Sequence, residues 1–336
     1  MAGEKHAFFD SNRKILWETL PLDTPFSVGI DPSTICNFKC KYCAQSHPES
    51  FESIGFHPEM MSMETFRKVA DQLAEFPRKI KKIHLECKGE SLCNPHVADM
   101  VRILKEKDVA ESIQIISNGS LLTPELSDAL IDAGLDILCI SLQGISDKSY
   151  YDTCGVHVSF QKMVDNIRYF YEHKGESEIY VKNVDVALNE GEEEIFYSMF
   201  ENIADRVFVE KIANLFTTVD YSDIIQKESS VNRYGEEIYR SVVCGFSFYY
   251  LLIFPNGDVR PCSNIQPSAI LGNVNTERLV DIWNGTKRRS FLKMQLLGNR
   301  EKNPVCRVCQ RPYENLRPED RLDGHEEELL EKFGLK

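Results

Sequence analysis

Residues 26–43 read FSVGIDPSTICNFKCKYC and combine a short apolar run with closely spaced cysteines. The run 26–30 is followed at once by Asp31-Pro32, and this pattern predicts a buried strand that ends at Ile30. Three cysteines then share one loop with the spacing C-x3-C-x2-C, and they are Cys36, Cys40 and Cys43. Three thiolates on one loop can hold three irons of a four-iron cluster and leave the fourth iron open to an outside ligand.

A zinc site completed by His47 is the alternative for this loop. Zinc motifs usually begin with C-x2-C and come as two separated pairs, so the spacing favours the iron–sulfur interpretation.

The composition bounds the class of protein. The chain has 336 residues, 42% hydrophobic and 27% charged, as in an ordinary globular protein. Its formal net charge is −13, and no basic stripe is seen, which argues against a nucleic-acid partner. The short basic clusters at Arg78-Lys79, Lys81-Lys82 and Lys287-Arg288-Arg289 are interpreted as solvated helix ends.

The sequence also bounds the compartment. It contains no apolar run of about 18 residues and no apolar signal segment at its start, so we expect no membrane partner and a cytoplasmic location. Eleven cysteines in that reducing compartment indicate metal or redox chemistry rather than a disulfide framework.

Beyond the first strand, strand-like runs alternate with helical patterns as far as about residue 215. The expected strands are 82–86, 113–116, 135–142, 178–186 and 206–210, and the expected helices are 63–76, 95–107, 124–133, 158–173 and 192–203. Such alternation predicts parallel β-α-β units. Six strands are fewer than the eight of a complete barrel, so the expected fold class is α/β, with an open or partial (βα)6 barrel.

After residue 215 the alternation stops. Residues 246–254 predict a strand, Pro255-Asn-Gly-Asp258 a turn, and residues 259–262 the returning strand of a hairpin. A helix is expected around 276–284. We therefore expect four parts: a lead-in over 1–25, the partial barrel over 26–215, a small cysteine-bearing hairpin and helix domain over 216–317, and a helical tail over 318–336.

A second set of cysteines belongs to the small domain. Cys244 and Cys262 flank the predicted hairpin, and Cys306 and Cys309 form a C-x2-C pair. Four thiolates can close a second iron–sulfur cluster completely. From the spacing alone, a structural zinc ribbon is an equal alternative.

The segment Cys36-Asn-Phe-Lys-Cys-Lys-Tyr-Cys43 resembles the signature of the radical SAM superfamily, including the aromatic Tyr42 before the third cysteine. Further resemblances fall where predicted strands end, and the carboxyl ends of parallel strands are where such sheets bind ligands. They are Gly89-Glu90, similar to the Gly-Glu motif that holds the methionine amino group, Ser117-Asn118-Gly119, similar to a Thr-Asn-Gly segment, and Ser141-Leu-Gln143-Gly144, similar to a Ser-Leu-Asp-Gly segment.

The resemblance covers roughly residues 26–215 and includes departures. Lys182 matches a position where relatives carry a basic residue for the methionine carboxylate. Lys88-Gly89-Glu90-Ser91 stands where members often have Gly-Gly-Glu-Pro, and Gln143 replaces the common aspartate.

The C-terminal part resembles the SPASM/Twitch extension of radical SAM enzymes. The resemblance rests on Cys244, Gly257 and Cys262 with Leu271-Gly-Asn-Val274 and Ile282-Trp-Asn284. No cysteine follows Cys309, so the shorter Twitch type is expected, with one auxiliary cluster held by Cys244, Cys262, Cys306 and Cys309. This resemblance favours iron–sulfur over zinc.

The resemblance implies an enzyme that generates a 5′-deoxyadenosyl radical from S-adenosylmethionine at a 4Fe-4S cluster held by Cys36, Cys40 and Cys43. An external one-electron reductant, such as flavodoxin or ferredoxin, would charge that cluster. A closed auxiliary 4Fe-4S cluster suits acceptance of an electron from a substrate radical, and hence oxidation of the substrate by dehydrogenation. Oxidation of an alcohol needs a base; Asp31, Glu86 and Glu210 are candidates, and none is assigned.

The expected substrate is a small polar molecule such as a sugar, an aminocyclitol or a nucleotide-linked sugar. The lead-in over 1–25 is too short for the peptide-recognition domain of many peptide-modifying relatives. Peptide or protein modification is the alternative, and a radical epimerase with Cys154 as hydrogen donor is another. A non-catalytic, metal-stabilised binding protein is a remote alternative. The resemblances at Gly89-Glu90, Ser117-Asn118 and Ser141 indicate a cofactor pocket, which a structural metal does not need.

Overall fold

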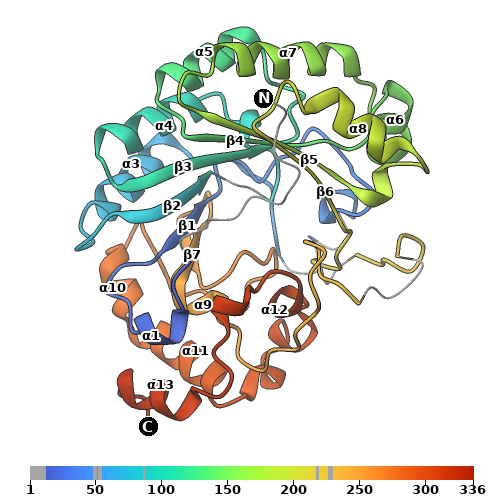
Figure 1. Cartoon of the computed structure of the whole chain (residues 1–336). Helices are drawn as coiled ribbons and strands as arrows, with labels where there is room; N and C mark the ends of the chain where they lie inside the picture. The colour runs from blue at the N-terminus through green and yellow to red at the C-terminus, as the bar shows by residue number, and fades with distance from the viewer. Residues whose placement is uncertain (1–12, 48–50, 52–54, 86–87, 217–218, 226–229) are drawn as a thin grey trace.

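The computed structural model describes residues 13–47, 51, 55–85, 88–216, 219–225 and 230–336, and every structural statement below concerns these. Their fold is α/β, built on a nine-stranded sheet in the order β6-β5-β4-β3-β2-β1-β7-β8-β9 (Figure 1). The first six strands in the chain are β1 Ser27–Ile30, β2 Ile80–Leu85, β3 Ala110–Ser117, β4 Ile137–Ser141, β5 Glu178–Val184 and β6 Arg206–Glu210. All their pairings are parallel, which confirms the predicted partial barrel.

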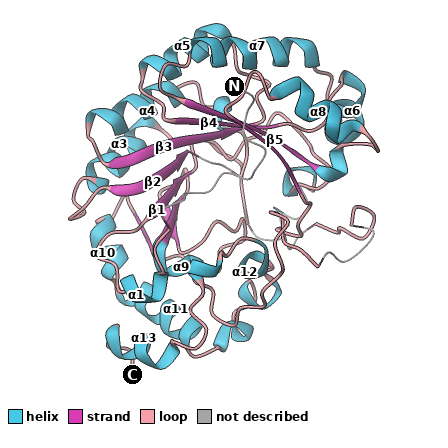
Figure 2. Ribbon diagram, in the orientation of Figure 1, coloured by secondary structure: helices cyan, strands magenta, loops and turns pink. Residues whose placement is uncertain are grey.

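Helices cover the outer face of the curved sheet (Figure 2). They are α3 Met63–Leu73, α4 Val97–Glu106, α5 Pro124–Asp132, α6 Asp147–Cys154, α7 Phe160–His173 and α8 Glu192–Phe200. The start of α3 is fixed by Ser62, whose side chain accepts a hydrogen bond from the Thr65 N–H, and Phe66 and Val69 on its inner face are fully buried.

Among the outer helices in the described part of the chain, α6 is the one that the sequence did not predict. Its signal is a capping box in which Ser146 and Ser149 exchange hydrogen bonds, and Gly155 ends it in the left-handed conformation at φ 65°. The helix carries no strong apolar stripe, so periodicity does not reveal it.

The C-terminal part continues the same sheet. Strand β7, Tyr250–Ile253, lies parallel to β1, with Ser27 opposite Tyr250 and Ile30 opposite Ile253. Strands β8 Asp258–Arg260 and β9 Gly272–Asn273 follow, and the antiparallel β7–β8 pair is the predicted hairpin. The other helices are α1 Leu16–Thr19, α9 Phe246–Tyr249, α10 Leu279–Asn284, α11 Thr286–Leu296, α12 Arg311–Glu314 and α13 Glu326–Lys332. Short 3-10 turns occur at Ala44–Ser46, Ser91–Cys93, Asp185–Ala187, Asn299–Lys302, Cys306–Val308 and Pro318–Asp320.

The prediction of one strand over 246–254 was wrong in its first half, because Phe246–Tyr249 forms the helical turn α9. A Cβ on Gly245 would lie 2.2 Å from the Asp320 carbonyl oxygen, so the backbone is tightly packed here. The Ser247 hydroxyl donates to the Cys244 carbonyl at 3.1 Å, which holds the turn. An apolar aromatic run of this length fits a helical turn and a strand equally well.

The interpretation of Lys287-Arg288-Arg289 as solvated was wrong for Arg288. Its guanidinium lies 3.3 Å from the centroid of the Trp283 ring and donates to the carbonyl oxygens of Trp283 and Phe248 at 3.1 and 2.9 Å. Burial lowers the pKa of Arg288 to about 9. Among the described helices, none is both long and apolar enough to cross a membrane.

Candidate active site

A cavity of about 610 Å³ lies on the inner face of the curved sheet. Alternate residues of the strands point into it, and they include His84, Gln114, Ser141, Tyr180, Lys182 and Glu210. Other parts of its wall come from residues between 211 and 216, from Tyr221, Arg233 and Tyr234, from residues between 311 and 320, and from Ser263. Both halves of the chain therefore build one site.

The cysteine loop follows β1, and its thiols are partly buried. The Phe38 N–H donates to Cys36 Sγ at 3.3 Å, and Cys40 Sγ lies 3.4 Å from Cys154 Sγ. Burial raises the pKa of Cys36 and of Cys43 to about 12, and the hydrogen bond with Cys154 together with burial raises that of Cys40. Such thiols are neutral on their own, but a coordinating metal deprotonates a thiol outright.

Two of the predicted cofactor-binding segments meet at Glu90. The Glu90 carboxylate is buried and accepts hydrogen bonds from Ser117 Oγ at 2.6 Å and the Asn118 N–H at 2.7 Å. Asn118 Nδ2 in turn donates to Asn37 Oδ1 in the cysteine loop at 2.9 Å. These bonds join the ends of β2 and β3 to the cysteine loop, and they occupy the Glu90 carboxylate itself.

Gly89 is required by close backbone packing. A Cβ at this position would lie 2.3 Å from the Ile35 carbonyl oxygen, and the Glu90 N–H donates to that same oxygen at 2.8 Å. Replacement of the family's preceding glycine by Lys88 therefore leaves intact the one glycine that this approach needs.

Gln45 is a site residue that the sequence reading missed. Its Nε2 donates to the carbonyl oxygens of Thr34 at 2.9 Å and Lys88 at 2.5 Å, so one side chain ties the cysteine loop to the end of β2. A single glutamine two residues after Cys43 carries no signal in one sequence.

Tyr42 and Gln143 both line the cavity with a buried polar atom that lacks a partner within the described part of the chain. These atoms are the Tyr42 hydroxyl and Gln143 Oε1. Gln143 Nε2 is held by the Ser141 carbonyl at 2.9 Å. Unpaired buried polar atoms that face a cavity fit a site completed by a bound polar molecule.

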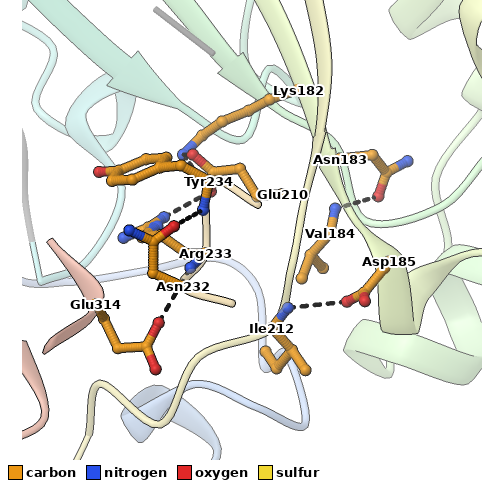
Figure 3. A network of polar contacts seen from close by, with 10 residues as sticks. All are labelled: Lys182, Asn183, Val184, Asp185, Glu210, Ile212, Asn232, Arg233, Tyr234 and Glu314. Atoms are coloured by element: carbon orange, nitrogen blue, oxygen red, sulfur yellow. Dashed lines mark hydrogen bonds and ion pairs between the residues drawn. The ribbon is translucent and has the colours of Figure 1, made fainter. Parts of the chain in front are cut away.

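Lys182 lies beside Ser141 in the sheet and forms part of an ion network (Figure 3). Its Nζ lies 3.0 Å from Glu210 Oε2, and Arg233 Nη2 lies 2.5 Å from the same oxygen. Burial raises the pKa of Glu210, but Arg233 and Lys182 outweigh it and lower the pKa to about 2. Glu210 is thus a fixed carboxylate, poorly suited to accept a proton at neutral pH.

The other two candidate bases gain no support. Asp31 is buried and does not line the cavity. Glu86 lies outside the described residues.

The second set of cysteines gathers polar groups around its sulfurs. Asn264 Nδ2 donates to Cys309 Sγ at 3.6 Å, Gln295 Nε2 donates to Cys306 Sγ at 3.7 Å, and Ser268 Oγ lies 3.3 Å from Cys262 Sγ. Burial raises the pKa of Cys244, and the nearby thiols of Cys309, Cys262 and Cys306 raise it further. Hydrogen bonds to cluster sulfurs are typical of iron–sulfur sites, so these four residues fit a cluster.

Single-ion sites are not supported by the geometry. In the described ranges, no three His, Cys, Asp or Glu side chains gather closely enough to hold one metal ion. Thiolates on a single zinc lie about 3.8 Å apart, whereas a four-iron cluster spreads them over four metal atoms.

Cys154 does not reach the cavity. It is fully buried, contacts Cys40, and is absent from the cavity wall. This position does not suit a residue that must donate hydrogen to a substrate.

The interpretation of Lys81-Lys82 as a solvated helix end was wrong. Both lysines lie on β2 and line the cavity.

Comparisons with known proteins support this arrangement. The model of the radical SAM superfamily matches residues 30–199, just over half of the chain, and that of an iron–sulfur cluster-binding domain, SPASM, matches residues 244–310. A tungsten-containing aldehyde ferredoxin oxidoreductase cofactor-modifying protein of Pyrococcus furiosus is 28% identical over 141 residues, 42% of this chain and 37% of that protein. The match thus spans little more than a third of the relative's length.

Two solved structures share the fold. BtrN in complex with AdoMet and 2-DOIA has a TM-score of 0.53 at 18% identity and covers 84% of this chain and 92% of its own. Streptococcus suis SuiB bound to precursor peptide SuiA has a TM-score of 0.56 at 17% identity and covers 79% of this chain and 66% of its own.

Proposed function

The chain belongs to the radical SAM superfamily and carries a SPASM iron–sulfur cluster-binding domain, and on that premise we propose that it dehydrogenates a small polar molecule. S-adenosylmethionine, a 4Fe-4S cluster and an auxiliary cluster are its cofactors. The observation that carries the proposal is the position of the cavity between the two cysteine sets. Tyr42, beside Cys43, lines it from one side, and Ser263, beside Cys262, lines it from the other.

We assign the radical-generating cluster to Cys36, Cys40 and Cys43, and the auxiliary cluster to Cys244, Cys262, Cys306 and Cys309. When bound, these groups and S-adenosylmethionine supply a 5′-deoxyadenosyl radical, which removes one hydrogen atom from the substrate, and an acceptor for the second electron. The hydroxyl proton would pass to solvent, and the product would be a carbonyl compound. The electron for the cluster held by Cys36, Cys40 and Cys43 would come from an external one-electron reductant in the cytoplasm.

The chain's own residues position these reactants. We assign the methionine end of S-adenosylmethionine to Gly89, Glu90, Ser117 and Asn118, which lie at the ends of β2 and β3 beside the cysteine loop and outside the cavity wall. Tyr42, Ser141, Gln143 and Lys182 line the cavity itself, and the first and third offer the unpaired polar atoms described above.

The size of the cavity supports a small substrate. About 610 Å³ must house S-adenosylmethionine and the substrate together, and sites of this size typically hold drug-sized molecules. The fold itself does not decide, because one structural neighbour holds 2-DOIA and another holds a peptide.

Iron content tests the proposal on protein purified and reconstituted without oxygen. Two four-iron clusters predict about eight irons per chain, about four in a Cys36/Cys40/Cys43→Ala variant, and about four in a Cys306→Ala/Cys309→Ala variant. The first variant should lose 5′-deoxyadenosine formation, and the second should form 5′-deoxyadenosine without oxidised product. Cys93→Ala, a change outside both sets, should keep the iron content of wild type.

A different result would redirect the assignment. Four irons and one zinc in wild type would make the C-terminal site structural. Redox-neutral chemistry, such as epimerisation or rearrangement, would then replace dehydrogenation.

A further inference from the structure

The cavity carries an excess of positive charge. Ten of its lining residues are lysine or arginine, and two, Glu210 and Asp320, are acidic. The whole chain has a formal net charge of −13, so the charge of the cavity wall is opposite in sign to that of the whole chain. A cleft lined by one sign of charge focuses the field and attracts ligands of the opposite sign.

Both acidic residues of the cavity already have cationic partners. Glu210 is shared by Lys182 and Arg233 (Figure 3), and Asp320 Oδ1 accepts from Arg13 Nη2 at 2.5 Å. Neither carboxylate is left to neutralise the other cations. Lys211 and Arg317 are paired with acidic residues outside the wall, Asp185 and Glu236. The charge offered to a ligand must therefore come from fewer cations than the wall contains.

Three arginines gather on the wall opposite the strands. The guanidinium of Arg233 lies 5.5 Å from the centroid of the Tyr234 ring, and that of Arg317 lies 5.0 Å from it. Arg311 lines the cavity from α12, and Glu314 at the other end of this short helix accepts from the Arg233 N–H at 3.0 Å. We call Arg233, Arg311 and Arg317 the arginine wall.

Arg311 is the member of the arginine wall with spare bonding capacity. Over the described ranges it forms no ion pair with an acidic residue, and its buried Nε has no hydrogen-bond partner. A planar guanidinium binds phosphate oxygens through two parallel hydrogen bonds, which a lysine cannot do.

The cofactor accounts for only part of the charge. S-adenosylmethionine brings one carboxylate, and Lys88, whose charge acts on the Cys43 thiol, lies on the same side as the cysteine loop. Arg233 and Arg317 are paired with Glu210 and Glu236. Arg311 comes two residues after Cys309, where its charge and its backbone N–H act on that thiol, and it also lines the cavity, so it is the arginine placed to meet a ligand beside the second cysteine set.

We infer that the substrate is a phosphorylated small molecule, a sugar phosphate or a nucleotide-linked sugar, whose phosphate is bound by the arginine wall with Arg311 as its principal contact. The inference rests on the proposed function and narrows it. A neutral sugar offers no anion to Arg311, and the cationic amines of a free aminocyclitol are repelled by the arginine wall. The tyrosines at 180, 234 and 249 add flat surfaces on which a sugar ring or base can pack.

Equilibrium binding tests the inference without turnover. The reconstituted full chain with S-adenosylmethionine is titrated in a calorimeter with pyrophosphate, glucose 1-phosphate, UDP-glucose, glucuronate, glucose and glucosamine. Pyrophosphate and at least one phosphorylated sugar should bind at least tenfold more tightly than glucose or glucosamine, and the binding should weaken as salt rises. The ratio of glucose 1-phosphate to UDP-glucose affinity separates the two phosphate sources.

Variants locate the anion. Arg311→Gln should weaken pyrophosphate binding at least tenfold, Arg311→Lys should restore part of it, and Lys287→Gln, which removes a charge from the exposed start of α11, should leave it unchanged. Equal losses in Arg311→Gln and Lys287→Gln would place the anion on the general surface and overturn the inference. So would glucuronate or glucosamine binding as tightly as the phosphates, a result that stands even where Arg311→Gln fails to fold.

The two proposals fail separately. Formation of 5′-deoxyadenosine with no phosphate binding would overturn this inference and leave the proposed function. If the wild type binds phosphate, Arg311→Gln loses that binding, and the wild type never cleaves S-adenosylmethionine, the proposed function would be overturned and the phosphate site would remain.

Discussion

At the residue scale, Glu210 links the stability of the protein to the charge of its cavity. Its side chain is 12% exposed, and its negative charge offsets the positive charges of Lys182 and Arg233. We expect Glu210→Gln to lower the free energy of unfolding by roughly 3 kcal/mol at pH 7, because two partly buried cations lose their shared anion. Exposed Glu193→Gln on α8 is the matched control and should change it by less than about 0.5 kcal/mol.

The pH dependence of that loss follows from the lowered pKa. The Glu210 carboxyl has a pKa of about 2 when folded against an ordinary value of 4.5. Its contribution is therefore complete above pH 4.5 and is lost as the pH falls from 4.5 towards 2. Urea denaturation should show a smaller gap between wild type and Glu210→Gln at pH 4 than at pH 7, and a gap that widens on acidification would contradict this account.

Gln45 makes a second prediction at this scale. Gln45→Ala removes both hydrogen bonds between the cysteine loop and the end of β2, so the loop is held less firmly. We expect lower iron retention after exposure to air, with unchanged secondary structure by circular dichroism. Gln161→Ala on the surface of α7, where the side chain bonds only Asp165, is the control. Equal iron retention in both variants would show that Gln45 does not hold the cysteine loop.

At the element scale, the sequence predicts the strands and the motifs at their ends, but it does not predict which distant side chains contact them. The six parallel strands and the hairpin follow from apolar runs and turn residues, and the cysteines, Gly89 and Asn118 follow from motif resemblance. Helix α6 is polar, and α9 is an apolar aromatic run that is helical in the packed structure. The spacing of apolar residues along the sequence therefore could not assign either element. Gln45, the Glu210 network and the arginine wall are contacts between distant segments, which one sequence does not encode as a local pattern.

Arg288 fixes the position of α11 against α9 and α10. Its guanidinium satisfies two buried carbonyl oxygens and covers the Trp283 ring. We expect Arg288→Ala to cost about 2–3 kcal/mol in chemical denaturation, because buried acceptors lose their donor. The neighbouring Arg289→Ala, which loses one exposed hydrogen bond to Gly334, should cost under about 1 kcal/mol. A similar cost for both would mean that the helix is not held through Arg288.

At the scale of the whole molecule, the cavity exists only because one sheet runs through both cysteine-bearing parts. The boundary predicted at residues 215 and 216 separates two sequence patterns, yet β7 pairs with β1 across it. Gln72 of α3 donates to the Val274 carbonyl at 2.9 Å and accepts from the Leu279 N–H at 2.8 Å, and Trp283 Nε1 donates to the Leu22 carbonyl at 3.0 Å. These bonds cross the same boundary.

Neither part should therefore fold well alone. A chain truncated after residue 215 leaves β1 as an unpaired edge in a hydrophobic setting, since Val28 and Ile30 are fully buried in the whole molecule. We expect this fragment to aggregate on size-exclusion chromatography, and the fragment 216–336 to lack cooperative unfolding. Mixed and refolded together, the two should recover a monomer-sized species with the circular dichroism of the full chain. A truncated barrel that stays monomeric and unfolds cooperatively would show instead that the C-terminal part is an accessory, and the argument that one sheet must build the site between the two cysteine sets would not hold.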